Sequence, residues 1–259
     1  MARLFVVRAF VRWSRLRMGL RWASSQRSGA WRRWRLALAM LAHQGRWIAQ
    51  SALLGVRDPD VLRRHLVVEG EANLPPVGTA TLLLGFHLGS PRGDLALRLV
   101  GRRVTWVGQP RISKGWSRIM RFPLLDLRQG LGKPRARAGW LYHARRVLLD
   151  GGAVFIAADR LAGRPGPEIV VPGGPIPIAS GWLALRRHTG AVTLPVLSHM
   201  EGRRWVVTIH RPLPPLESDP RTDFERCRDA LTPLLADYLG RFPEQSVYLM
   251  FNPRMSNVP

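Results

Sequence analysis

Residues 81–94 read TLLLGFHLGSPRGD, and this stretch decides the fold class. Its first part, Thr81–Phe86, is apolar and as long as a typical buried strand. His87 follows at once, and small residues then turn the chain. Ser90 is a favourable helix N-cap and Pro91 suits the first helical position, so a helix should begin there. The stretch predicts a buried strand whose carboxyl end leads through His87 into a helix.

Short apolar segments alternate with helical segments from residue 81 onward. Strands separated by helices are typical of an α/β layer. We therefore predict an α/β fold with a mixed, mainly parallel sheet flanked by helices. Further strands are expected over residues 103–107, 153–158, 168–171, 192–198, 204–210 and 247–251, and helices over 91–100, 113–122, 135–150, 178–189 and 224–241.

The first 60 residues differ from the rest, because they are basic, helical in pattern and poor in turn residues. Over residues 1–22, apolar side chains collect on one side of the predicted helix and most arginines on another, with tryptophans among them. This pattern is typical of a helix at the head-group boundary of a membrane. A helix packed on the protein's own core is the alternative. We predict a membrane-associating segment over 1–60 and an α/β domain over 61–259, with a charged connector at 61–75.

The charge is strongly unbalanced, with 40 basic residues against 17 acidic ones and a formal net charge of +23. Such a field attracts polyanions, whether nucleic acid, anionic lipid or phosphorylated substrates. No motif of a nucleic-acid-binding module is present, so specific nucleic-acid binding is not expected. Residues 36–56 form the longest apolar stretch near the start, but polar residues interrupt it and make it a poor membrane span. The start also lacks the apolar core of a signal peptide.

His87 is the candidate catalytic residue. Open α/β sheets bind their ligands at the carboxyl ends of the strands, where His87 is expected. The adjacent helix N-terminus favours an anion or a developing oxyanion. An imidazole in this position can act as a general base toward a hydroxyl, provided that a carboxylate orients it. The ordinary alternative is a histidine that is hydrogen-bonded at a strand end without a catalytic role.

Several ordered blocks resemble a known family. VVEGEANLPP begins at Val67, and HLGSPRGDLALRLVG begins at His87. PGGPIPIASGWLALRRHTGAVTLPV covers residues 172–196, and RFPEQSVYLMFNPR covers 241–254. In order and spacing these blocks resemble the bacterial lipid A lauroyl and myristoyl acyltransferases, a branch of the wider lysophospholipid and glycerolipid acyltransferase superfamily.

This resemblance implies an α/β acyltransferase at the cytoplasmic face of a bacterial inner membrane, attached as a peripheral or monotopic protein. It implies that an acyl group passes from an acyl carrier protein or acyl-CoA thioester to a hydroxyl of a lipid acceptor at an anionic membrane surface. His87 would be the general base. The resemblance implies no metal and no bound cofactor, because the acyl thioester is a co-substrate.

One departure concerns the acid that should orient His87. In the resembled family, Asp or Glu follows the histidine after four residues, and here Arg92 takes that position. Asp94 is the nearest carboxylate and the predicted catalytic partner, if the helix starts later than Ser90. Otherwise the two positions differ by about 200° of rotation and 3 Å of rise, and Asp94 cannot simply replace the missing acid. Asp159 is the alternative partner.

Further residues are predicted to contact the substrate. Asp159 follows a predicted strand where the resembled family has a substrate-contacting loop, and nearby arginines suit a phosphate. The ordinary alternatives are solvated surface charges for the arginines, a tight turn for the glycine pair and a helix cap for the serine. The predicted substrate-binding residues are Arg92, Arg111, Asp159, Arg160, Arg164, Gly173, Gly174 and Ser180.

Four further tryptophans and the single cysteine are interpreted mainly as packing residues. Trp106 and Trp182 lie in core-like patterns, whereas Trp116 and Trp140 flank the expected site and suit either the core or the wall of an acyl groove. The single Cys227 excludes an intramolecular disulfide and a cysteine-based metal cluster.

The position of Arg92 also motivates a second hypothesis, that of a catalytically impaired membrane-associated relative that acts as a binding protein.

Overall fold

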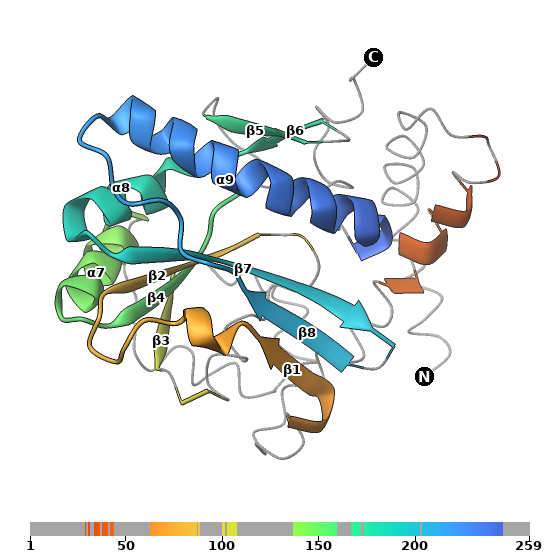
Figure 1. Ribbon diagram of the computed structural model, residues 1–259, viewed down its shortest axis with the longest axis horizontal. Coiled ribbons are helices and arrows are strands. Elements are labelled where there is room, and N and C mark those ends of the chain that lie inside the picture. Colours follow the sequence, from red (N-terminus) through yellow and green to blue (C-terminus); the bar gives the residue numbers. More distant parts are fainter. Residues whose placement is uncertain are drawn as a thin grey trace.

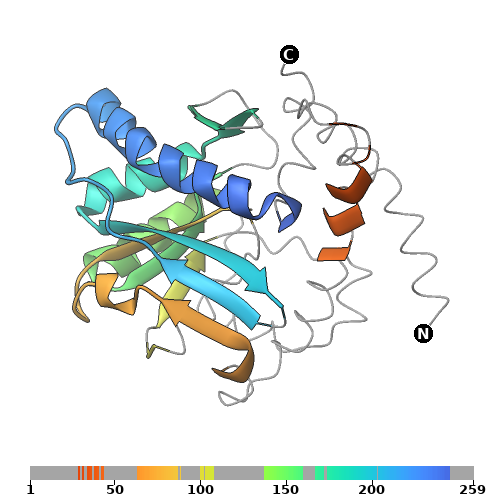
Figure 2. The same cartoon turned by 45° about the vertical axis from the view of Figure 1, so that its right-hand side comes forward.

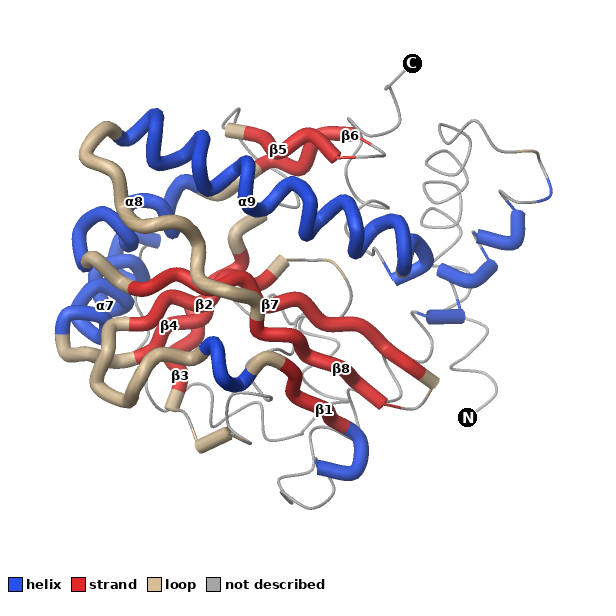
Figure 3. Tube along the Cα trace, viewed as in Figure 1, coloured by secondary structure: helices blue, strands red, loops and turns tan. Residues whose placement is uncertain are grey.

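The computed structural model describes residues 63–86, 88, 100–101, 103–107, 137–159, 167–171, 174–202 and 204–245, together with 29, 31, 34–36, 38–40 and 42–43. Strands and helices alternate over most of these ranges (Figures 1 and 3). The elements are β1 (Leu66–Glu69), η1 (Glu71–Asn73), β2 (Thr81–Gly85), β3 (Val104–Val107), α7 (Arg137–Leu149), β4 (Ala153–Ala157), β5 (Glu168–Val171), β6 (Gly174–Pro177), α8 (Ser180–Thr189), β7 (Val192–Glu201), β8 (Arg204–Ile209), α9 (Pro220–Arg241) and η3 (Pro243–Gln245).

The main sheet confirms the predicted mixed, mainly parallel architecture. Its strand order is β1-β8-β7-β2-β4-β3. Strands β7 and β8 pair antiparallel and are joined by a tight turn that includes Gly202 at a φ of 56°. The other pairings in this sheet are all parallel. Parallel neighbours need long crossover connections, which is why helices lie between these strands in the sequence.

The two faces of the main sheet bury different sets of apolar side chains, because successive side chains of a strand point to opposite faces. The helix-side cluster joins Leu82 and Leu84 of β2 to side chains of α7, α8 and α9, so all three helices cover one face (Figure 2). The opposite-face cluster joins Leu83 of β2 to Phe155 of β4 and Trp205 of β8. Strand β2 is therefore buried on both faces, as its uninterrupted apolar sequence predicts.

The predicted connector at 61–75 is wrong, because this stretch contains both β1 and η1. Strand β1 pairs in parallel with β8, which is far away in the sequence. The Asn73 side-chain amide donates to the Ile209 carbonyl at 2.7 Å and fixes the turn after β1. A short strand of this kind forms through its distant partner, so its local composition does not reveal it.

The prediction for residues 172–180 also needs correction. Gly174, for which a tight turn is the ordinary alternative, is the first residue of β6 and pairs with Val171, the last residue of the antiparallel β5. Helix α8 begins at Ser180 instead of residue 178, because Ile178 still forms an extended bridge with Asp159. The N-cap of α8 is Ala179, which offers no side-chain cap, so the alternative role of Ser180 as a cap is wrong.

Helix α9 starts earlier than the predicted residue 224. Its N-cap is Asp219, whose carboxylate accepts a hydrogen bond from the Thr222 backbone N–H at 2.7 Å. That hydrogen bond lowers the pKa of Asp219, because it favours the charged carboxylate. Pro220 then occupies the first turn, where its missing N–H costs nothing. The predicted helices 91–100 and 113–122 and the strand 247–251 lie essentially outside the described residues.

Gly85, the last residue of β2, gives a first testable consequence of this packing. A Cβ at Gly85 would lie 2.3 Å from Cζ of Phe155, whose ring covers the glycine. We expect Gly85→Ala to lower the free energy of unfolding by about 1–3 kcal/mol in urea denaturation, the usual cost of overpacking. Gly240→Ala is the matched control, since a Cβ there meets nothing within 4 Å. Equal effects of the two substitutions would contradict this explanation.

Cys227 gives a second prediction. Its side chain is fully buried on α9, and burial raises the pKa of the thiol to about 11. Only the thiolate reacts with disulfide reagents, so the native protein should react very slowly at pH 7.5. The thiol should react fully and rapidly in denaturant, as followed by release of the chromophore from a thiol-reactive disulfide. Rapid reaction of the native protein would show that α9 does not protect this position.

Candidate functional site

Two parallel strands, β2 and β4, end at the same level of the main sheet, and their neighbour β7 continues past that level. The register pairs Gly85 of β2 with Ala157 of β4 and with Val196 of β7. The Ala158 N–H donates to the Gly85 carbonyl at 2.8 Å, which extends the β2–β4 pairing past the last strand residues. In Figure 1, β4, β2 and β7 lie side by side in this order. This is the edge at which the sequence predicts the site.

Most of the predicted site residues lie outside the described residues. These are His87, Asp94, Arg92, Arg111, Arg160, Arg164 and Gly173. Their predicted roles stay predictions. The residues that flank His87 in the sequence are described, and both Phe86 and Leu88 are buried in the helix-side cluster. The chain is therefore anchored in the core immediately before and after His87.

Asp159 is the predicted site residue that the structure places most clearly. It is only 4% exposed and lies two residues beyond the end of β4, just as His87 lies two residues beyond the end of β2. Ile156 and Ala158 belong to the helix-side cluster, so by alternation Asp159 shares the opposite face with Phe155. A carboxylate is thus buried two residues beyond the level at which β2 ends. Buried carboxylates persist when they are paired or have a function.

Ser180 and Gly174 belong to the segment that runs past Asp159. Ile178 bridges Asp159, and the Ala179 N–H donates to the Ala158 carbonyl at 2.7 Å. Ser180 is exposed in the first turn of α8, whereas Gly174 is buried in β6. The structure therefore brings Ser180 near the Asp159 backbone and leaves Gly174 several residues away along β6.

Ser198 is a site candidate that the sequence analysis missed. It lies two residues beyond Val196 on β7, at the same offset as Asp159 beyond Ala157 on β4, and it is only 3% exposed. Val196 belongs to the opposite-face cluster, so Ser198 and Asp159 share one face and lie on strands on either side of β2. Ser198 is recognised only from the register between β4, β2 and β7, and this register cannot be read from a single sequence.

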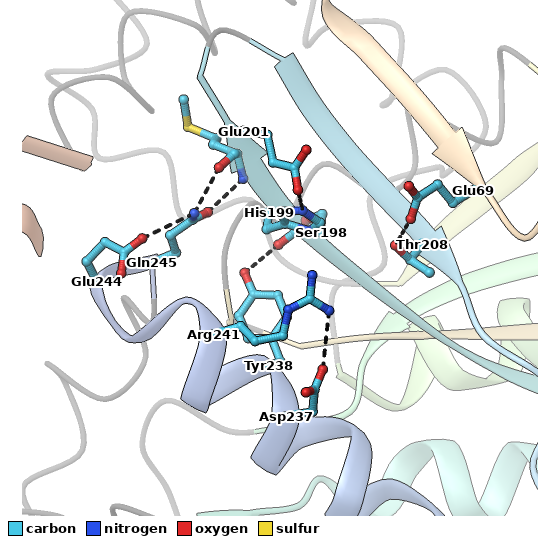
Figure 4. A network of polar contacts seen from close by, with 11 residues as sticks. Glu69, Ser198, His199, Glu201, Thr208, Asp237, Tyr238, Arg241, Glu244 and Gln245 are labelled. Carbon is cyan, nitrogen blue, oxygen red and sulfur yellow. Dashed lines mark hydrogen bonds and ion pairs between the residues drawn. The ribbon is translucent and has the colours of Figure 1, made fainter.

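A network of polar contacts holds the extension of β7 against the end of α9 (Figure 4). The Tyr238 hydroxyl donates to the Ser198 carbonyl at 2.6 Å, and burial raises the pKa of this phenol, so it stays protonated as a donor. The Gln245 side chain accepts from the Met200 N–H at 2.7 Å and donates to the Met200 carbonyl at 3.0 Å. These contacts fix the backbone on both sides of residue 199 and so hold Ser198 in position.

His199 belongs to the same network. Its Nε2 lies 2.9 Å from Oε1 of Glu201, and its ring stacks on Phe242 with the ring centroids 4.1 Å apart. The stack directs this ring toward the end of α9, away from the face that carries Ser198. We interpret His199 as a structural contact between β7 and the end of α9.

Trp140 and Trp182 agree with their expected packing roles. Trp182 is fully buried between the helices, and Trp140 is half-buried against the same helix-side cluster. Trp116 and the side chain of Trp106 lie outside the described part.

The described residues contain neither a cluster of metal ligands nor a membrane-spanning helix. Among these residues, no group of three or more His, Cys, Asp or Glu side chains is arranged to hold a metal ion. No helix in the described ranges combines the length and the apolar character that a membrane crossing requires.

Comparisons with known proteins give likenesses to solved structures alone. No family model matches the chain, and no curated protein matches its sequence. The fold is similar to the crystal structure of the 1-acyl-sn-glycerophosphate acyltransferase PlsC from Thermotoga maritima, with 20% sequence identity and a TM-score of 0.43. The match covers 74% of this chain and 79% of that chain. A likeness of this size does not assign an activity, so the function has to be argued from the residues themselves.

Proposed function

We propose that this chain is an acyltransferase of the lysophospholipid and lipid A acyltransferase superfamily. It would move a fatty acyl group from an acyl thioester to a hydroxyl of a lipid acceptor. The observation that carries the proposal is the buried carboxylate of Asp159, two residues beyond the end of β4. His87 follows the end of the neighbouring strand β2 by the same number of residues in the sequence. The ordered sequence blocks that resemble lipid A acyltransferases give independent support.

In the proposed reaction, His87 acts as the general base. Its imidazole removes the proton from the acceptor hydroxyl as the oxygen attacks the thioester carbonyl. An ester C–O bond forms, the C–S bond breaks, and the proton passes from the imidazolium to the leaving sulfur as a free thiol. Asp159 accepts a hydrogen bond from the other ring nitrogen, which fixes the tautomer and stabilises the imidazolium.

Register favours Asp159 over Asp94 as the partner of His87. Neighbouring strands lie about 4.8 Å apart, so residues at the same level of two parallel strands are within reach of each other. Asp159 is fixed in that position by the Gly85–Ala158 hydrogen bond and by the bridge to Ile178. Asp94 lies seven residues beyond His87 in the sequence and reaches it only if the turn between them is rebuilt.

The setting that we propose is the cytoplasmic face of a bacterial inner membrane. The excess of arginine suits both anionic lipid and the phosphate groups of a lipid acceptor or of a coenzyme A or carrier-protein donor. Arg92, Arg111, Arg160 and Arg164 are the proposed phosphate contacts. The reaction as written needs neither a metal ion nor a bound cofactor, because the thioester already carries an activated acyl group.

Thiol release tests this function directly. Purified protein is mixed with acyl-CoA or with acyl carrier protein loaded with acyl chains of several lengths. Lysophospholipid or an underacylated lipid A precursor is added as the acceptor. We expect acceptor-dependent release of free thiol together with a new acylated lipid in mass spectrometry. If no donor and acceptor pair gives turnover, the proposal is wrong.

A catalytically impaired binding protein is the second candidate, because Arg92 takes the position at which the resembled family has an acid. In that case His87→Ala would leave the function of the protein in cells intact, and no thioester would be consumed.

A further inference from the structure

Ser198 is a polar side chain in an apolar row of β7. Val196 and Met200 lie two residues before and after it, and both belong to the opposite-face cluster, 3% and 7% exposed. Side chains at this spacing point to the same face of a sheet, so Ser198 lies between them and is itself 3% exposed. A hydroxyl gains little from burial in such a row. Packing alone therefore does not account for a serine at this position.

Asp159 is the counterpart of Ser198 on the other side of β2. Both residues lie two positions beyond a residue that pairs with Gly85, and both lie on the same face of the sheet. Because β2 lies between β4 and β7, the two backbones are two strand spacings apart, roughly 10 Å. His87 follows Gly85 by the same two residues in the sequence. A ring with one hydrogen-bonded group on each side fits this width.

The backbone of β7 is held firmly at this point. Ser198 pairs with Val207 of β8, and its carbonyl accepts the hydrogen bond from the Tyr238 hydroxyl at 2.6 Å. Two residues further on, the Gln245 side chain binds both backbone groups of Met200 (Figure 4). A donor on such a fixed backbone needs no rearrangement when charge develops near it, which is the condition for electrostatic catalysis.

We propose that the Ser198 hydroxyl donates a hydrogen bond to the thioester carbonyl oxygen as this oxygen becomes negatively charged during acyl transfer. The inference rests on the proposed function and deepens it. Asp159 there holds one ring nitrogen of His87, so the acceptor hydroxyl meets the other nitrogen, on the side of β7. The carbonyl under attack lies next to that hydroxyl and within reach of Ser198. The serine is thus a further catalytic residue, and it forms no covalent bond.

Kinetics of Ser198 variants test this role. We expect Ser198→Ala to lower kcat about 10²-fold with little change in the KM for the acyl thioester, because the hydrogen bond strengthens only in the transition state. Ser198→Cys should also lose activity, since a thiol is a weak donor of nearly the same size. Ser198→Thr should keep most of the wild-type kcat because it carries the same hydroxyl. Thiol release at varied donor concentration gives both constants.

Thr193→Val is the matched control. Thr193 lies on the same strand, is 2% exposed, and its hydroxyl donates to the Ala191 carbonyl at 3.0 Å. The substitution removes a buried hydroxyl from β7 away from the candidate site, so kcat should stay at the wild-type value. Circular dichroism verifies that each variant is folded. An equal loss of kcat in Thr193→Val would mean that the assay reports the integrity of β7, and the proposal would fall.

Two further outcomes would overturn the role of Ser198. One is a kcat of Ser198→Ala within about threefold of the wild-type value. The other is an acyl group attached to Ser198 in acid-quenched reactions without acceptor, detected by peptide mass spectrometry, because the serine would then be a nucleophile. Wild-type turnover with either result ends this inference alone. Absence of turnover in the wild type ends the proposed function and this inference with it.

Discussion

His87→Ala should lower thioester turnover by about 10²–10⁴-fold, the usual contribution of a positioned general base. Asp159→Asn should lower kcat as well, because the amide cannot stabilise the imidazolium, whereas Asp94→Asn should change kcat little. Thiol release with a saturating donor and acceptor measures all three. We expect a larger loss of kcat from Asp159→Asn than from Asp94→Asn because the register aligns the end of β4 with the end of β2.

His188→Ala is the matched control for this series. It removes an imidazole that is exposed near the end of α8 and is absent from the proposed site. We expect wild-type turnover from this variant. If Asp94→Asn abolishes turnover and Asp159→Asn does not, the partner of His87 is Asp94 and the helix after His87 must begin late. Full activity of His87→Ala would end the enzymatic proposal.

Asp223→Ala should lower the free energy of unfolding by about 3–5 kcal/mol, the largest effect on stability that we expect from a single charge. The Asp223 carboxylate lies 3.1 Å from the Arg186 guanidinium, and their side chains are 1% and 3% exposed. The same carboxylate oxygen accepts from the Glu217 N–H at 3.2 Å. Removing it leaves the guanidinium buried without its counter-charge, since the Pro214 carbonyl supplies only a neutral acceptor at 2.5 Å.

Urea denaturation measures this effect, and two variants control it. Glu225→Ala breaks an exposed ion pair with Arg221 on the same helix and should cost less than about 1 kcal/mol. The double variant Arg186→Met/Asp223→Leu should recover much of the loss, because two apolar side chains need no pairing in the interior. A loss below 1 kcal/mol for Asp223→Ala would mean that water reaches Arg186.

The alternation of strands and helices could be read from the sequence because each central element has a strong local pattern. Strands β2 and β4 are uninterrupted apolar runs, and α7 was predicted within two residues of its observed ends. The failures lie where structure depends on distant partners. Strand β1 forms through its pairing with β8, and the bridge between Ile178 and Asp159 moves the start of α8 to Ser180.

Some residues of the candidate site could be found from the sequence and others only from the structure. Asp159 could be proposed from its place after an apolar strand, with its burial unknown. Ser198 could not be singled out, because it looks like any serine on a strand until β7 is aligned with β2. The two sides of the helical residues between 31 and 43 needed the structure as well, since only packing shows that Met40 is buried while Trp31 stays exposed.

The sequence by itself determined the central strands and helices, such as β2, β4 and α7, and that a histidine follows the apolar strand β2. Local hydrophobic pattern and turn chemistry carry that information. Only the tertiary structure decided that Asp159 and Ser198 lie on one face, each two residues beyond the level at which β2 ends. Register between strands arises from hydrogen bonds and packing among segments that are distant in the sequence. Here residues 81–85 pair with residues 192–196, more than 100 residues later. A shift of this register by one residue would turn each side chain to the other face of the sheet.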